Sequence, residues 1–239
     1  SRVEAICSAI IREGYDIEWT ADVRANYFDR YDRGFMETLR KSGCKELIIG
    51  AESGSPRILE AIQKDITVDQ VRDAVKKSLE QGIEVFGLFM VGFPWENARD
   101  VELTMDLIDE LTKMDKERVK TTVSIFSPYP GTRLYDSVVK DDGFTPPGSL
   151  EAWGEWNFSS IANTPWFDPE YRSFLEAVAN IARVKSAKFE WSKNPMFRGK
   201  SVVRSFFVTS GKFRWQRRFF KSPVEWTVWT MIQRWRGYA

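Results

Sequence analysis

The chain has 239 residues, of which 43% are hydrophobic and 29% are charged, a composition typical of a globular protein with a sizeable core. It contains no histidine and only two cysteines, which excludes a Ser-His-Asp triad and the usual zinc shells from this sequence. No run approaches the roughly 20 apolar residues that cross a bilayer. The two cysteines fit no metal spacing, and we expect a reducing, cytoplasmic setting, with association at a membrane surface as the alternative.

Helical and strand patterns alternate through the first 140 residues. In chain order they predict a helix over 2–13, a strand over 17–25, a helix over 32–39, a strand over 46–51, helices over 56–63 and 67–81, a strand over 84–91, a helix over 97–114, a strand over 119–126 and a short helix over 134–139. Successive strands begin about 29, 38 and 35 residues apart, the spacing of βαβ units with parallel strands. The sequence therefore predicts a parallel α/β fold.

Polar and small residues recur on one face of these strands. On the first strand Glu18, Thr20, Asp22 and Arg24 share a face, because successive side chains of a strand alternate between its two faces. A fully packed barrel fills its interior with branched apolar side chains. We therefore expect a wide, partial (β/α) barrel with a polar concave face. The alternative is that residues 18–24 form an exposed edge strand.

Each of three successive strands ends in a distinctive loop. The second strand runs into Gly50-Ala51-Glu52-Ser53-Gly54, and Ser55 is placed to cap a helix that opens with Pro56. The third strand runs into Gly92-Phe93-Pro94-Trp95-Glu96. The fourth runs into Tyr129-Pro130-Gly131-Thr132, which suits a type II turn. Ligands of parallel α/β folds are held at this carboxyl edge of the sheet.

Taken in order, these three motifs resemble those of the radical S-adenosylmethionine (SAM) enzymes, and most closely the branch that often carries a cobalamin-binding domain. The resemblance covers about residues 1–140, which would be the later strands of a TIM-like (β/α)6 barrel. It implies a four-iron four-sulfur cluster that cleaves SAM reductively to a 5′-deoxyadenosyl radical, with cobalamin as a further cofactor in part of the family.

The resemblance also implies roles for individual residues. Glu52 and Ser53 would lie at the strand end that binds the ribose and methionine parts of SAM, and Arg24 would pair with its carboxylate. The adenine would be bordered by Gly92, Phe93, Pro94, Tyr129, Pro130 and Gly131.

The sequence departs from the family at the cluster. The Cys-x-x-x-Cys-x-x-Cys loop is absent, and Cys7 and Cys44, both expected in the core, cannot supply three thiolates. We therefore expect this chain to be the carboxyl-terminal portion of a longer radical SAM enzyme, with the cluster ligands upstream. Two alternatives stay open: a (β/α) hydrolase that uses paired carboxylates such as Glu52 and Asp22, and a non-catalytic binding module that acts through the tail.

The tail differs from the rest of the chain in charge. Residues 185–239 contain 13 Lys and Arg but only two acidic residues, a net charge of +11, whereas residues 1–184 carry −10. We expect a barrel domain over 1–140, a connector over 141–168 and a helical, basic, aromatic-rich region over 169–239. The expected partners are a small-molecule substrate, the rest of the barrel or an upstream domain, and an acidic partner or an anionic membrane surface on the tail; nucleic acid is the weaker candidate.

Overall fold

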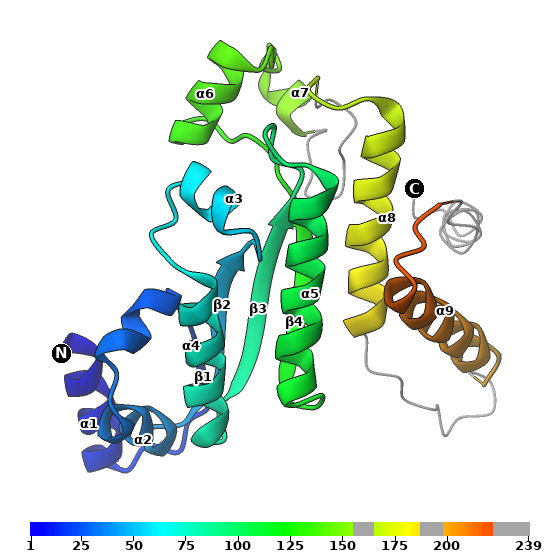
Figure 1. The fold of residues 1–239 in the computed structure, drawn as a ribbon. Helices are drawn as coiled ribbons and strands as arrows, with labels where there is room; N and C mark the ends of the chain where they lie inside the picture. Colours follow the sequence, from blue (N-terminus) through cyan, green and yellow to red (C-terminus); the bar gives the residue numbers. More distant parts are fainter. Residues whose placement is uncertain (155–164, 187–197, 222–239) are drawn as a thin grey trace. The chain divides into compact units, whose positions relative to one another are not determined.

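A computed structural model describes residues 1–154, 165–186 and 198–221. The chain folds as two compact units, Ser1–Thr122 and Val123–Ala239. The elements of the first unit, drawn in Figure 1, are α1 (Arg2–Glu13), β1 (Trp19–Val23), the 3-10 helix η1 (Ala25–Arg30), α2 (Arg33–Lys41), β2 (Cys44–Glu52), α3 (Pro56–Ala61), α4 (Val68–Glu80), β3 (Glu84–Val91), α5 (Ala98–Met114) and the start of β4 (Val119–Ile125).

The strands form one sheet in the order β1-β2-β3-β4. β1 pairs in parallel with β2, and β2 pairs in parallel with β3. The predicted α/β class with parallel strands is therefore confirmed. β1 is the first strand in this order, and Thr20 and Asp22 on it are exposed.

The two faces of the sheet differ in burial. On β2 and β3 every second residue is buried, including Ile49, Ala51, Val85 and Phe89, and α4 packs on both strands. The residues between them, among them Gly50 and Glu52, are only half-buried, so these two share the less covered face as the strand alternation predicted.

Local sequence signals fixed most helix ends. Gly14 ends α1 in the left-handed conformation (φ 68°), Asp32 caps α2, and Thr67 with Gln70 forms a capping box at the start of α4. The predicted strand over 17–25 is shorter in the structure, because Ala25 and Phe28 are buried in the turn of η1.

Helix α1 buries only part of its apolar face. Cys7 is buried, as predicted, but Val3, Ile6 and Ile11 are exposed. Cys44 is also buried, and both cysteines are free thiols.

The second unit continues from the end of β4 through α6 (Arg133–Asp141), α7 (Leu150–Gly154), α8 (Pro169–Ser186) and α9 (Arg198–Gln216). α8 and α9 pack against each other, and the Phe174 and Phe220 rings lie 5.6 Å apart between their centroids. The tail is helical where it is described, as predicted. The domain boundaries at 140 and 168 stay a prediction, because part of the expected connector, 155–164, lies outside the described residues. Across the described parts of the chain, no helix combines the length and the apolar character that crossing a membrane requires.

Candidate functional site

The carboxyl end of β2 closes in a strained turn at Glu52. The Ser53 N–H donates to the Ala51 carbonyl oxygen at 2.7 Å, and Glu52 between them has a φ of 59°. A three-residue turn with positive φ at its centre is rare and strained for a residue with a side chain. Such strain persists where the surrounding structure holds it in place, so Glu52 is a candidate for a functional role.

The Glu52 side chain folds back over the strand and pairs with a lysine. Lys64 Nζ lies 2.5 Å from Glu52 Oε1, and both side chains are largely withdrawn from solvent. Gly50 provides the space for this ion pair, because a Cβ there would lie 2.9 Å from Glu52 Oε1 and 3.2 Å from Lys64 Nζ. The spacing Gly50-x-Glu52 in the sequence therefore has a physical reason: the carboxylate needs the surface that the missing side chain leaves open.

Two side chains from the end of β1 hold the loop that carries Lys64. The Arg24 guanidinium donates to the Lys64 carbonyl oxygen, and Asn26 Nδ2 donates to the Asp65 carbonyl oxygen at 3.0 Å. We call Arg24, Asn26, Glu52 and Lys64 the strand-end cluster. Within the described residues, Arg24 Nε and Asn26 Oδ1 are buried with no hydrogen-bond partner, which leaves one donor and one acceptor unmet in the cluster.

Backbone strain is concentrated around this cluster. Of the four residues other than glycine that have positive φ in the described chain, three are Glu52, Gln63 (52°) and Asp65 (54°), which flank or belong to it. Strained residues gather at functional sites more than elsewhere. The buried polar atoms without a partner and the strained backbone therefore both lie at the strand-end cluster, which makes it the candidate binding site.

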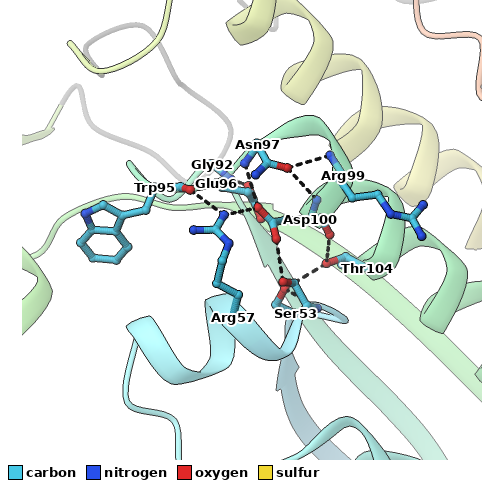
Figure 2. Close-up of polar contacts among 10 residues, drawn as sticks. Ser53, Arg57, Gly92, Trp95, Glu96, Asn97, Arg99, Asp100 and Thr104 are labelled. Carbon is cyan, nitrogen blue, oxygen red and sulfur yellow. Dashed lines mark hydrogen bonds and ion pairs between the residues drawn. The ribbon is translucent and has the colours of Figure 1, made fainter.

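The segment after Glu52 is anchored on helix α5. Ser53 is fully buried, and its hydroxyl lies 3.1 Å from the Thr104 hydroxyl, which also accepts the Gly54 N–H at 3.0 Å (Figure 2). A Cβ on Gly54 would lie 2.2 Å from the Leu103 carbonyl oxygen, so only glycine allows the loop to approach the helix this closely. The Ser53 side chain thus holds the loop and does not face outward.

Asp100 joins the loops that follow β2 and β3. It accepts the Ser55 hydroxyl at 2.6 Å and a guanidinium nitrogen of Arg57, and Arg57 also donates to the Trp95 carbonyl oxygen at 2.7 Å (Figure 2). Burial alone would raise the pKa of Asp100, but the hydrogen bonds from Arg57 and Ser55 outweigh it and hold the pKa below its usual value. The prediction that the Ser55 side chain caps α3 was wrong, because its hydroxyl bonds to Asp100 and makes no bond to the helix backbone.

The loop after β3 folds around a buried carboxyl group. Gly92 has a φ of 91°, and its N–H donates to Glu96 Oε2 (Figure 2). Burial raises the pKa of Glu96 to about 8, although the backbone hydrogen bonds from Gly92 and Phe93 act in the opposite direction. Asn97 caps α5, whereas Glu96 turns back to the strand end.

The loop after β4 belongs to the second unit. The Thr132 N–H bonds to the Tyr129 carbonyl oxygen at 3.3 Å and Gly131 has a φ of 84°, so the predicted type II turn with Pro130 and Gly131 at its centre is confirmed. Tyr129 is exposed.

The predicted site residues thus fall into three groups. Arg24 and Glu52 meet through Lys64. Ser53 and the 92–94 segment are linked through α5 and Arg57. Residues 129–131 lie in the other unit.

Sequence reasoning missed Lys64, Asn26, Arg57, Asp100 and Thr104. These residues belong to no sequence motif. They meet their partners only through the folding of the strand-end loops, across 12 to 51 residues of sequence.

The cysteines do not fit an iron–sulfur cluster. In the described parts of the chain, no group of three or more His, Cys, Asp or Glu is placed to hold a metal ion. Burial and the neighbouring Cys7 raise the pKa of Cys44 to about 12, which keeps this thiol protonated and unsuited to ligation.

Comparison with known proteins shows a similarity to the radical SAM superfamily. Residues 2–108 match the model of the radical SAM superfamily. An uncharacterized methyltransferase, PH0819, from Pyrococcus horikoshii is 38% identical over 133 residues, which cover 56% of this chain and 27% of that protein. A putative methylthiotransferase, MJ0865, from Methanocaldococcus jannaschii is 33% identical over 118 residues, which cover 49% of this chain and 24% of that protein. The chain therefore spans about a quarter of the length of these relatives.

A solved structure shows the same fold at low identity. The radical SAM methyltransferase TsrM from Kitasatospora setae, with cobalamin and a [4Fe-4S] cluster bound, matches with a TM-score of 0.50 and 18% identity, over 61% of this chain and 27% of that one. The parallel α/β sheet therefore matches the fold of a partial TIM-like barrel. Over residues 2–108 this chain is therefore similar to the radical SAM superfamily.

Proposed function

We propose that this chain supplies the later strands of the barrel of a radical SAM enzyme, and that the strand-end cluster and the loop after β3 hold part of the SAM molecule. The reaction class we propose is transfer of a methyl or methylthio group, the activity named for the two relatives above. In the superfamily, SAM bound at an iron–sulfur cluster is the source of a 5′-deoxyadenosyl radical.

The observation that carries the proposal is the chemistry of the strand-end cluster. Glu52 is anionic, while Arg24 and Lys64 are cationic, and Arg24 Nε and Asn26 Oδ1 have unmet hydrogen-bonding capacity within the described residues. The methionyl part of SAM is a zwitterion, with an ammonium and a carboxylate group close together. A cluster that presents both signs of charge suits such a ligand.

Each residue then has a chemical task in the proposed site. Glu52 accepts hydrogen bonds from the ammonium group or the ribose hydroxyls, and Arg24 with Lys64 attracts the carboxylate. The loop from Gly92 to Pro94 is proposed to border the adenine. Ser53 does not contact the ligand in this proposal; its hydroxyl holds the loop after β2 on Thr104 of α5.

The alternatives have less support. A hydrolase would need a second carboxylate across a cleft from Glu52, but the charged group in contact with Glu52 is Lys64. Cobalamin is a further cofactor within the proposal and not an alternative to it. In the branch that uses cobalamin it binds to a separate domain, and we propose that this protein uses it too.

The test uses this chain joined downstream of a segment that carries the Cys-x-x-x-Cys-x-x-Cys motif, reconstituted with iron and sulfide without oxygen. With SAM and a reductant, it should form 5′-deoxyadenosine. Glu52→Gln should lower the yield about tenfold, because it removes a charge-assisted hydrogen bond. Glu60→Gln, on the exposed side of α3, is the matched control and should retain the wild-type yield. A cluster-loaded protein that forms no 5′-deoxyadenosine would contradict the proposal.

A further inference from the structure

The segment that includes helix α9 has an unusual composition. Residues 198–221 contain eight Lys and Arg, five Phe and no acidic residue. This pattern plays no part in the proposed SAM site, and it therefore calls for a separate explanation.

One face of α9 packs within its own unit. Val208 and Trp215 are buried, α9 packs against α8, and the Phe220 ring, which follows the helix, lies 5.6 Å from that of Phe174. The fold therefore already uses one apolar side of this helix.

The other side of α9 exposes aromatic rings among cations. Phe206 is 64% exposed and Phe213 is 57% exposed, and a spacing of seven residues places them two turns apart on one side of the helix. Lys212, next to Phe213 in the sequence, and Arg217, just beyond the end of α9, are exposed as well. Just beyond the helix, Phe219 is 48% exposed and is followed by exposed Lys221. We call Phe206, Lys212, Phe213, Arg217, Phe219 and Lys221 the aromatic-basic face.

We propose that the aromatic-basic face docks on the surface of an anionic phospholipid bilayer. Exposed phenylalanines can enter the boundary between headgroups and acyl chains, while long cationic side chains reach the phosphates. Charge complementarity supports an anionic partner for the tail, because the tail carries +11 whereas the first 184 residues carry −10. An anionic surface therefore attracts the tail and repels the rest of the chain.

The ring geometry favours a bilayer over a nucleic acid. The Arg217 guanidinium lies 5.9 Å from the centroid of the Phe213 ring, and that of Arg214 lies 5.1 Å from the centroid of the Phe219 ring. Bases stack on open ring faces, and here one face of each ring is covered by a guanidinium group. Insertion into a bilayer boundary is compatible with such pairs, because the cation remains at the level of the phosphates.

The test is flotation of the 239-residue chain with vesicles of phosphatidylcholine alone or mixed with phosphatidylglycerol. We expect binding only to the anionic vesicles and a loss of binding at high salt. Phe206→Ser with Phe213→Ser should weaken binding about tenfold or more, and so should Lys212→Glu with Arg217→Glu. Leu150→Ser, which changes another exposed apolar residue of the same unit, and Lys116→Glu, which changes an exposed lysine elsewhere, should bind as the wild type does.

Circular dichroism of each variant checks that the fold is kept, which is expected because all the changed side chains are exposed. Equal binding by the wild type and both face variants would overturn the inference. Binding to a single-stranded oligonucleotide without binding to anionic vesicles would also overturn it, in favour of nucleic acid. Neither result depends on whether the strand-end cluster binds SAM.

Discussion

At the scale of single residues, the candidate site depends on glycines that leave space and on polar groups withdrawn from water. Gly50 makes room for the Glu52–Lys64 pair, and Gly54 lets the loop touch α5. The sequence could predict that this motif matters, because Gly and Glu stand at a strand end. It could not predict Lys64, which lies 12 residues further on in a loop without a motif.

The two glycines should respond differently to the same substitution. In Gly54→Ala the new Cβ would meet the Leu103 carbonyl oxygen at 2.2 Å, and the backbone must move, so we expect a loss of about 2 kcal/mol or more in the free energy of unfolding. In Gly50→Ala the Cβ meets the flexible ends of Glu52 and Lys64, so the loss should stay within about 1 kcal/mol. Urea unfolding of both variants measures this, and equal losses would contradict the assigned roles.

Glu96 should make stability depend on pH. In the folded protein its carboxyl group keeps its proton up to about pH 8, whereas its ordinary pKa is 4.5. Folding therefore takes up a proton between these pH values, and this group lowers the free energy of unfolding as pH rises, by up to about 1.4 kcal/mol per pH unit.

Glu96→Gln keeps an acceptor for the Gly92 N–H but cannot ionise. Its advantage in stability over the wild type should grow from pH 5 to pH 8 and stay level above that. Urea unfolding at a series of pH values measures the difference. Parallel pH profiles for the two proteins would show that Glu96 is ionised in the fold.

At the scale of elements, the sequence predicted contacts within one helix turn correctly, but it did not predict contacts between residues far apart in the chain. The capping box of Thr67 and Gln70 was predictable because both residues belong to one helix turn. Ser55 was mispredicted because its hydroxyl bonds to Asp100, which is 45 residues away in sequence. A serine before Pro56 satisfies the local rule for a cap, and only the packing of α5 on the loop decides otherwise.

The anchoring of the β2 loop on α5 can be tested with two threonines of the same helix. Thr104→Val removes the hydroxyl that accepts the Gly54 N–H and contacts Ser53, so the Gly54 amide should exchange with deuterium about tenfold faster. Thr112→Val is the control, because its hydroxyl bonds to carbonyl oxygens of its own helix, those of Ile108 and Asp109. Unchanged exchange at Gly54 in Thr104→Val would show that the loop is held by other contacts.

At the scale of the whole molecule, the parallel α/β class followed from strand spacing, and the helical tail followed from composition. Strand spacing is a global constraint, since a crossover helix needs a minimum length between parallel strands. The difference in net charge between residues 1–184 (−10) and the tail, residues 185–239 (+11), can also be read from the sequence alone. The sequence could not predict which face of α9 stays exposed, because both of its sides carry aromatic residues.

The central claim is that the carboxyl edge of β2 and β3 binds SAM, and its most direct test is an NMR titration of the isotopically labelled 239-residue chain. Millimolar SAM should shift the backbone amide signals of residues 50–55 and 92–97, and Glu52→Gln should weaken these shifts while Glu60→Gln leaves them unchanged. Amide signals of these two segments that stay in place as SAM is added, or shifts confined to other parts of the chain, would contradict the account.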